Sequence, residues 1–300
     1  MIYFIRIFPI TFLFLSLTAA SLPAQESPVI AIGAELTLIS DQFSFTEGPA
    51  TDADGNVYFT DQPNNDIWIY NTNGELIHFM DNSGRANGLY FDLDGNLLAC
   101  ADEKSELWSI SPEKEVTVLV DNFNGKRLNG PNDLWVDPDG GIYFTDPYYQ
   151  RDYWERTESE MDERVYYLTP DRKDLFIVAD DLVKPNGIIG TADGKTLYIA
   201  DIGDGKTYSY SIDMHNGYLS DKTLFAEMGS DGVTLDEEGN LYLTGNGVTV
   251  FDKNGKQIEH IPVPQNWTAN LTFGGVDNQT LFITASTAVY SLEMKVKGMK

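Results

Sequence analysis

The sequence predicts an all-β protein, a six-bladed β-propeller with four strands per blade whose ring is closed by an N-terminal strand. Three observations support this fold. One short phrase occurs six times along the chain. Short runs of alternating or aromatic residues, broken by Gly, Asn and Asp, fill most of the sequence, and no long helical period interrupts them. The last repeat is one strand short, while a spare strand precedes the first.

The repeated phrase is a turn with Gly or Asn followed by an apolar strand that usually ends in Thr-Asp or Ala-Asp. Its six copies begin at Gly55, Gly95, Gly140, Gly194, Gly239 and Asn278. Consecutive copies lie 39 to 54 residues apart. A period near 45 residues with about four strands per unit is typical of a propeller blade.

The strands of the first and last units show how the ring closes. In the first unit we expect strands near 48–52, 56–61, 66–71 and 75–80. The last unit offers only three, near 270–275, 281–285 and 288–296, whereas residues 35–40 have no other partner. These residues are predicted to supply the missing outer strand, which removes an exposed sheet edge. Two stacked β-sandwiches are the competing arrangement, and the even repeat disfavours them.

The first 24 residues resemble a secretory signal peptide. Arg6 is followed by an apolar run over 7–17 and then by small residues, so cleavage is expected after Ala20 or Ala24. The alternative is an uncleaved anchor. We therefore expect one propeller domain over 25–300 in a secreted or periplasmic protein. Its single cysteine, Cys100, allows no intramolecular disulfide and is expected to be a buried core residue.

The charge balance limits the partners. The chain has 20 basic and 46 acidic residues, a net charge of −26. Such a surface repels phosphate backbones and anionic membranes, so we expect neither nucleic acid nor, after signal cleavage, membrane as a partner. It is compatible with divalent cations. The expected protein is a monomer or small homo-oligomer that acts on a small molecule.

Each unit opens with a polar residue just upstream of the repeated phrase. These residues are Glu47, Asn87, Asn132, Asn186, Asp231 and Asn270. Equivalent positions in a propeller form a ring around the central channel, so six oxygen-bearing side chains are predicted to converge. Two carboxylates with amide oxygens suit Ca²⁺, with Mg²⁺ or Mn²⁺ as alternatives. A polar, water-filled channel is the other interpretation.

The whole chain after residue 24 resembles the senescence-marker-protein/gluconolactonase/luciferin-regenerating-enzyme family, especially its bacterial gluconolactonase branch. The matching phrases lie at 45–49, 58–65, 128–133, 143–147, 185–187, 231–232, 270–275 and 281–285. The resemblance implies a propeller with one divalent metal on its axis. The implied ligands are Glu47, Asn132, Asn186 and Asp231. Asn87, Asp133 and Asn270 would then contact the substrate or orient the ligands.

The resemblance also implies an activity, the Ca²⁺-dependent hydrolysis of sugar lactones in carbohydrate metabolism, with Mg²⁺, Mn²⁺ or Zn²⁺ as alternative ions. Asp231 is the candidate general base. The alternatives are phosphotriester hydrolysis and a non-catalytic propeller that binds a ligand or a protein. One position departs from the family: animal members carry a sugar-binding arginine where this chain has Gly130, and the nearest arginine is Arg127.

The longest spacing between repeats contains an insertion over 148–163, after the strand that ends at Asp146. It combines tyrosines and a tryptophan with many charges. Such residues could stack on a sugar ring and bond its hydroxyls. A solvated surface loop is the alternative interpretation.

Overall fold

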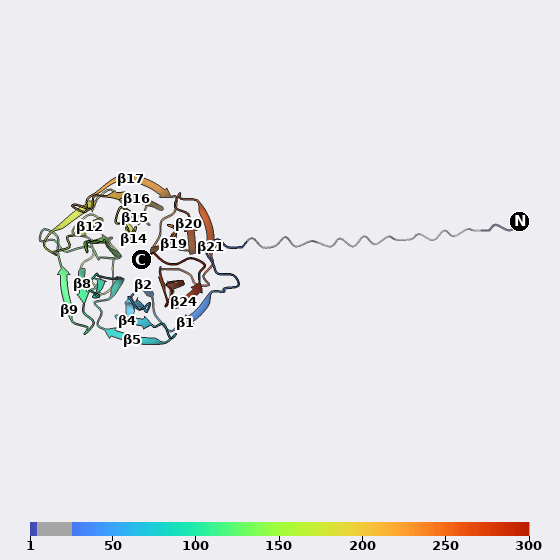
Figure 1. The fold of residues 1–300 in the computed structure, drawn as a ribbon, viewed down its shortest axis with the longest axis horizontal. Helices are drawn as coiled ribbons and strands as arrows, with labels where there is room; N and C mark the ends of the chain where they lie inside the picture. Colours follow the sequence, from blue (N-terminus) through green and yellow to red (C-terminus); the bar gives the residue numbers. More distant parts are fainter. Residues whose placement is uncertain (5–25, 300) are drawn as a thin grey trace.

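The computed structural model describes residues 1–4 and 26–299, and the predicted signal segment lies almost entirely outside these residues. Six antiparallel sheets of four strands surround a central axis (Figure 1). The predicted six-bladed β-propeller is therefore confirmed. The described residues contain one helical turn, η1 (Gln62–Asn64), and no helix with the length and hydrophobicity that a membrane crossing requires.

Blades 1 to 3 follow one another along the chain, each beginning with its innermost strand. Blade 1 comprises β2 (Thr46–Thr51), β3 (Val57–Asp61), β4 (Asp66–Tyr70) and β5 (Leu76–Asp81). Blade 2 comprises β6 (Ala86–Phe91), β7 (Leu97–Ala101), β8 (Glu106–Ile110) and β9 (Val116–Val120). Blade 3 comprises β10 (Leu134–Val136), β11 (Ile142–Asp146), β12 (Arg164–Leu168) and β13 (Leu175–Ala179).

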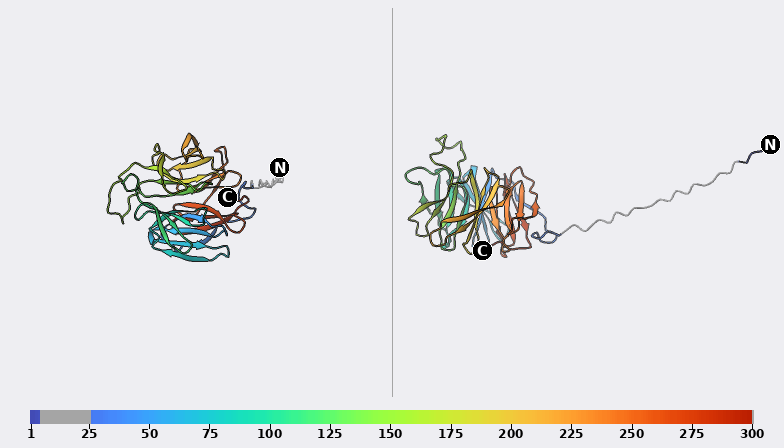
Figure 2. Two further views of the ribbon diagram at one scale, coloured as in Figure 1. Left: turned by 60° about the vertical axis from the view of Figure 1, so that its left-hand side comes forward. Right: turned by 90° about the horizontal axis from the view of Figure 1, so that it is seen from above.

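Blades 4 and 5 repeat this order. Blade 4 comprises β14 (Pro185–Gly190), β15 (Thr196–Asp201), β16 (Lys206–Ile212) and β17 (Leu219–Ala226). Blade 5 comprises β18 (Val233–Leu235), β19 (Leu241–Gly245), β20 (Gly247–Phe251) and β21 (Gln257–Ile261). Seen edge-on, the sheets form a disc, and the C-terminus lies at one of its flat faces (Figure 2).

Blade 6 closes the ring as predicted. Its inner strands are β22 (Asn270–Gly274), β23 (Thr280–Ala285) and β24 (Ala288–Glu293), and its outer strand is β1 (Thr37–Ser40) from the other end of the chain. In Figure 1, β1 in blue lies beside β24 in red. The two strands are antiparallel, with Thr37 opposite Ser291 and Leu38 opposite Tyr290. The strands of blades 1 and 6 match their predicted positions to within three residues at either end.

The apolar core lies between neighbouring sheets, because each sheet buries both faces against the next blade. Phe59 of blade 1 packs on Phe282 of blade 6, with ring centroids 5.4 Å apart. Cys100 on β7 is fully buried in a cluster with Phe144 of blade 3, as expected of a small core residue.

Three of the aspartates that end the repeated phrase bind the backbone of the segment that leads into the innermost strand of their blade. Asp61 accepts the backbone N–H groups of Ser44 and Phe45, which lead into β2. Asp146 does the same for Asn129 and Gly130, and Asp201 for Val183 and Lys184. In blades 1, 3 and 4 the repeat therefore fixes where the innermost strand starts, and with it the residues that face the axis.

Candidate active site

Five of the six predicted ring residues line one cavity of about 230 Å³ at the end of the channel where the innermost strands begin. They are Glu47, Asn87, Asn132, Asn186 and Asp231. Glu47, Asn87 and Asn186 lie at the start of β2, β6 and β14, and the other two lie two residues before β10 and β18. The fold thus brings together residues that are up to 184 positions apart in the chain.

Asn270 does not occupy the ring position that the prediction gave it, because it lies one residue further along the innermost strand of its blade. In blade 3, the N–H of Asn132 donates to the carbonyl of Thr145. In blade 6, the equivalent donor is the N–H of Ala269, which binds the carbonyl of Thr284. The ring position of blade 6 is therefore held by Ala269, so five oxygen-bearing side chains converge on the cavity, and the expectation of six is corrected.

Glycine follows the ring residue in four blades because backbones meet closely at the axis. A Cβ atom on Gly48 would lie 2.1 Å from the carbonyl oxygen of Asn87, and one on Gly88 would lie 2.5 Å from that of Asn132. A Cβ on Gly187 would lie 2.7 Å from the carbonyl oxygen of Asp231. At these three positions a side chain would collide with the backbone of the next blade, so glycine is required there.

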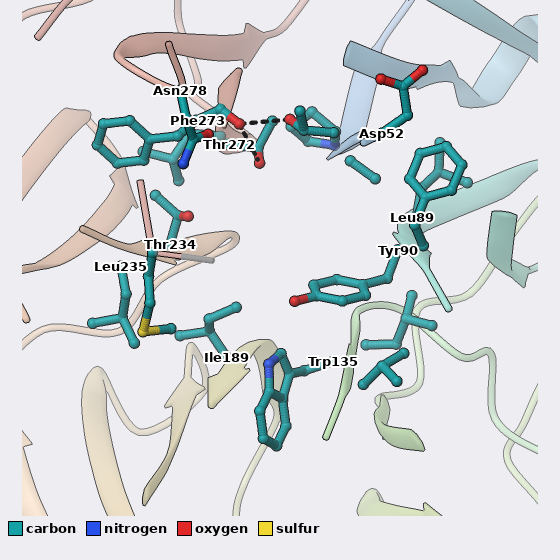
Figure 3. A pocket seen from close by; sticks show the side chains of 18 of the residues that line it. Asp52, Leu89, Tyr90, Trp135, Ile189, Thr234, Leu235, Thr272, Phe273 and Asn278 are labelled. Carbon is teal, nitrogen blue, oxygen red and sulfur yellow. Dashed lines mark hydrogen bonds between the residues drawn. The ribbon is translucent and has the colours of Figure 1, made fainter. Parts of the chain in front are cut away.

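Asp133 and Asn270 follow the ring position in the two remaining blades, and both point away from the cavity of the ring. They line a second, larger cavity of about 590 Å³ at the opposite end of the channel. Figure 3 shows this cavity, into which Tyr90 and Trp135 point from neighbouring blades. Its walls are a mixture of aliphatic, aromatic and polar groups, and the predicted metal ligands do not line it.

Two carboxylates give the ring cavity its electrostatic character. Glu47 is only 3% exposed, and Asp231 is partly exposed. Burial and the nearby charge of Asp231 raise the pKa of Glu47 well above its ordinary value. Burial also raises the pKa of Asp231 to about 6. Within residues 26–299, neither carboxylate forms an ion pair with a basic side chain. Such an arrangement favours a bound cation.

The amide side chains of the ring cavity also fit a hard cation. The side chains of Asn87 and Asn132 are almost fully buried, yet no other described residue hydrogen-bonds to their amide groups. The Nδ2 atom of Asn186 donates to the hydroxyl of Tyr149 at 3.0 Å, which leaves its Oδ1 atom as an acceptor. Carboxylate and amide oxygens are the ligands that Ca²⁺ prefers, and these amide oxygens have no competing partner among the described residues. The residues present therefore fit the implied metal.

Six cavity residues were not named as site residues from the sequence, and three of them carry polar groups beside the predicted ligands: Trp267, Tyr149 and Arg151. Trp267 precedes blade 6, and its indole Nε1 donates to Asp231 Oδ2 at 2.5 Å. Tyr149 and Arg151 belong to the insertion. The mixture of aromatic and charged residues there was the only signal of their role, and it did not single out either residue.

The insertion is anchored against the propeller. Trp154 is buried, and its indole N–H donates to the carbonyl of Asp102 at 3.0 Å. Arg156 donates to the carbonyl of Leu128 at 2.8 Å and to Ser105 Oγ at 2.9 Å. These contacts hold the start of the insertion beside the cavity, so the interpretation of a loop surrounded by solvent does not describe this part of it.

The structure also explains the departure at Gly130. A Cβ atom there would lie 2.5 Å from Asp102 Oδ1 and 3.0 Å from the Trp154 ring, so Trp154 occupies the space that a side chain would need. Arg127 lies outside the cavity, where its guanidinium donates to the carbonyls of Glu103 and Lys104.

Comparison with known proteins agrees with this architecture. The family model described as "SMP-30/Gluconolactonase/LRE-like region" matches residues 45–287. The gluconolactonase of Zymomonas mobilis is 28% identical, with 90% of this chain and 84% of that protein covered. A solved gluconolactonase of Xanthomonas campestris is 30% identical, covers 90% of this chain and 96% of its own, and superimposes with a TM-score of 0.82.

A more distant structure has the same fold. It is regucalcin of Agrobacterium tumefaciens, described as a calcium-binding protein, which is 18% identical and has a TM-score of 0.74. The match covers 88% of this chain and 95% of that one.

Proposed function

The chain belongs to the SMP-30/gluconolactonase/LRE-like family, and we propose that it hydrolyses sugar lactones with one divalent cation, Ca²⁺ in the first place, held in the ring cavity. The observation that carries the proposal is the convergence of Glu47 and Asp231 on one small cavity whose remaining ring residues are amides. Gluconolactonases of Zymomonas mobilis and Xanthomonas campestris are relatives over most of the chain.

The cation would be held by Glu47, Asn132, Asn186 and Asp231, with Asn87 beside them. When bound, such an ion polarises a carbonyl group and lowers the pKa of a nearby water molecule. The cavity of about 230 Å³ has room for about one sugar ring.

Asp231 is the proposed general base. Its Oδ2 atom accepts the indole N–H of Trp267, which fixes the orientation of the carboxylate toward the cavity. The attacking water gives a proton to the carboxylate as its oxygen bonds to the lactone carbonyl carbon. The bond from this carbon to the ring oxygen then breaks, and the ring oxygen takes up the proton. The product is a hydroxy acid.

A carboxylate that also binds a cation is a weaker base, so Asp231 could instead only position the water. The variant Asp231→Asn separates the two roles. If Asp231 is the base, the variant loses far more catalytic rate than metal affinity. Equal losses in both would show that Asp231 is only a ligand.

The proposal is tested with a pH-stat assay on D-glucono-1,5-lactone, before and after chelation and after Ca²⁺ is added back. A phosphotriester serves as the alternative substrate. We expect lactone hydrolysis that chelation abolishes and Ca²⁺ restores. The variant Glu47→Gln should lose this activity, whereas Glu113→Gln, which changes an exposed carboxylate of blade 2, should keep it. Turnover of the phosphotriester alone would overturn the proposal.

We also propose that the protein is exported, because residues 1–24 have the pattern of a signal peptide. N-terminal sequencing of protein recovered from outside the cytoplasm should begin after Ala20 or Ala24. An intact N-terminus on cytoplasmic protein would contradict export.

A further inference from the structure

Arg151 places a positive charge in the ring cavity, beside the carboxylates of Glu47 and Asp231. Its Nε atom donates to Asp102 Oδ2 at 2.8 Å, and its side chain is 25% exposed. No acceptor in the described part of the chain holds its two terminal NH₂ groups. These groups are therefore available to a molecule that occupies the cavity.

Asp102 has a different role from its equivalents in other blades. The aspartates that end β3, β11 and β15 accept backbone N–H groups at the entrance of their own blade. Asp102, which follows β7, instead accepts hydrogen bonds from the Arg151 guanidinium and the Tyr153 hydroxyl. A buried carboxylate of the repeat thus holds the guanidinium in place. An arginine fixed in this way loses little entropy when it binds a ligand.

Two further basic side chains lie against tyrosines of the insertion, although the chain as a whole is strongly acidic. The Nζ atom of Lys184 lies 4.7 Å from the centre of the Tyr149 ring. The guanidinium of Arg85 lies 4.6 Å from the centre of the Tyr153 ring. Both are paired with carboxylates, Lys184 with Glu163 at 3.8 Å and Arg85 with Glu103 at 3.9 Å, and neither lines the cavity. Among the described residues, Arg151 therefore supplies the basic side chain of the cavity wall.

We propose that Arg151 binds a carboxylate group of the substrate, so that the preferred substrates are sugar lactones that carry an additional acidic group. A guanidinium matches a carboxylate with two parallel hydrogen bonds, which a neutral hydroxyl cannot form. The proposal rests on the lactonase function above. It defines the substrate class as acidic sugar lactones, and Arg151 as the residue that determines this specificity.

The first test measures binding and needs no turnover. Calorimetry on the Ca²⁺-loaded protein compares D-glucarate, which has two carboxylates, with D-gluconate, which has one, and with neutral D-glucitol. We expect D-glucarate to bind at least about 10-fold more tightly than D-gluconate, since a charge-assisted bidentate pair contributes that much or more. The variant Arg151→Gln should remove this difference. Equal binding of the two acids by the unchanged protein would overturn the proposal.

The matched control is Arg172→Gln, because the Arg172 guanidinium donates to the carbonyl of Gly140 and does not line the cavity. It should keep the preference for D-glucarate. Arg151→Lys keeps the charge but loses the planar fork, so it should retain only part of the preference. An unchanged preference in Arg151→Lys or in Arg151→Gln would contradict a bidentate contact. Thermal unfolding verifies that each variant is folded.

The second test measures kcat/KM for D-glucaro-1,4-lactone, which carries a free carboxylate, and for neutral D-glucono-1,4-lactone. Arg151→Gln should lower the first by about 10-fold or more and leave the second within about twofold. Equal losses on both lactones would overturn the proposal. If neither lactone is hydrolysed, the proposed function fails, whereas the binding experiment still decides the role of Arg151.

Discussion

Asn270 donates a hydrogen bond to Asp133 across the propeller axis, from Nδ2 to Oδ2 at 3.5 Å, and so joins blades 3 and 6. Each of the two side chains also accepts the N–H of the residue that follows it, Leu134 at 3.0 Å and Leu271 at 2.8 Å. The other four blades have glycine at this level. The pair fills the space beside two of these glycines, because a Cβ atom on Gly88 would lie 2.7 Å from Asp133 Oδ1 and one on Gly232 would lie 2.1 Å from Asn270 Oδ1.

Exchanging the two residues tests this contact. Asn270→Asp alone places two carboxylates against each other, and we expect a loss of about 1–3 kcal/mol in the free energy of unfolding. Adding Asp133→Asn restores one donor and one acceptor, so the double variant should recover much of the loss. Urea unfolding with a chelator present measures both. If the loss of stability in the double variant equals the sum of the losses in Asn270→Asp and in Asp133→Asn, the two residues are not coupled.

Calcium should stabilise the folded protein, because Glu47 and Asp231 lie together in the native state alone. A ligand at 100 times its Kd raises the free energy of unfolding by about 2.7 kcal/mol. We therefore expect Ca²⁺ to raise the Tm, and Glu47→Gln to reduce this increase strongly. Thermal scans with and without chelator provide the measurement, with Glu113→Gln as control. An equal increase in Tm for Glu47→Gln would place the ion elsewhere.

The hydrogen bond from Trp267 to Asp231 should matter for rate more than for stability. Trp267→Phe keeps an aromatic ring but removes the N–H donor that orients the carboxylate. We expect kcat to fall by about 10-fold, which corresponds to an increase of about 1.4 kcal/mol in the activation free energy. The matched control is Trp68→Phe, since the buried indole N–H of Trp68 has no hydrogen-bond partner among the described residues. Steady-state assays of both variants with lactone compare them. Similar kcat values for the two would contradict the role of Trp267.

Asp146 should make stability depend on pH. Burial raises its pKa from 3.8 to about 7 in the folded protein. The folded state therefore binds a proton between about pH 4 and pH 7 that the unfolded state has released, and the contribution of Asp146 to the free energy of unfolding falls as pH rises through this window. Urea unfolding of the metal-free protein at several pH values should show a smaller decline for Asp146→Asn. Parallel curves would exclude Asp146 as the source.

The repeat made the fold predictable, whereas the site could be predicted only in part. Residues inside the repeat, such as Glu47 and Asp231, follow from aligning the six units. The alignment was wrong by one residue in blade 6. Asn270 was matched to the ring residues, but its N–H donates to Thr284 Oγ1 as that of Gly232 donates to Thr244 Oγ1, so it is equivalent to Gly232. Arg151 and Trp267 lie in connecting segments, which no repeat constrains, so their position depended on tertiary packing.

The seam between β1 and β24 has a consequence for the order of events during synthesis. The strand at Thr37–Ser40 is made early but finds its partner only when Ala288–Glu293 has emerged. Five blades can assemble from contiguous segments as the chain grows, whereas the sixth must wait for a pairing between strands near opposite ends of the chain. Pairings of this range are slow to form. Until then, β1 and β24 each expose an unpaired strand edge that could pair with another chain.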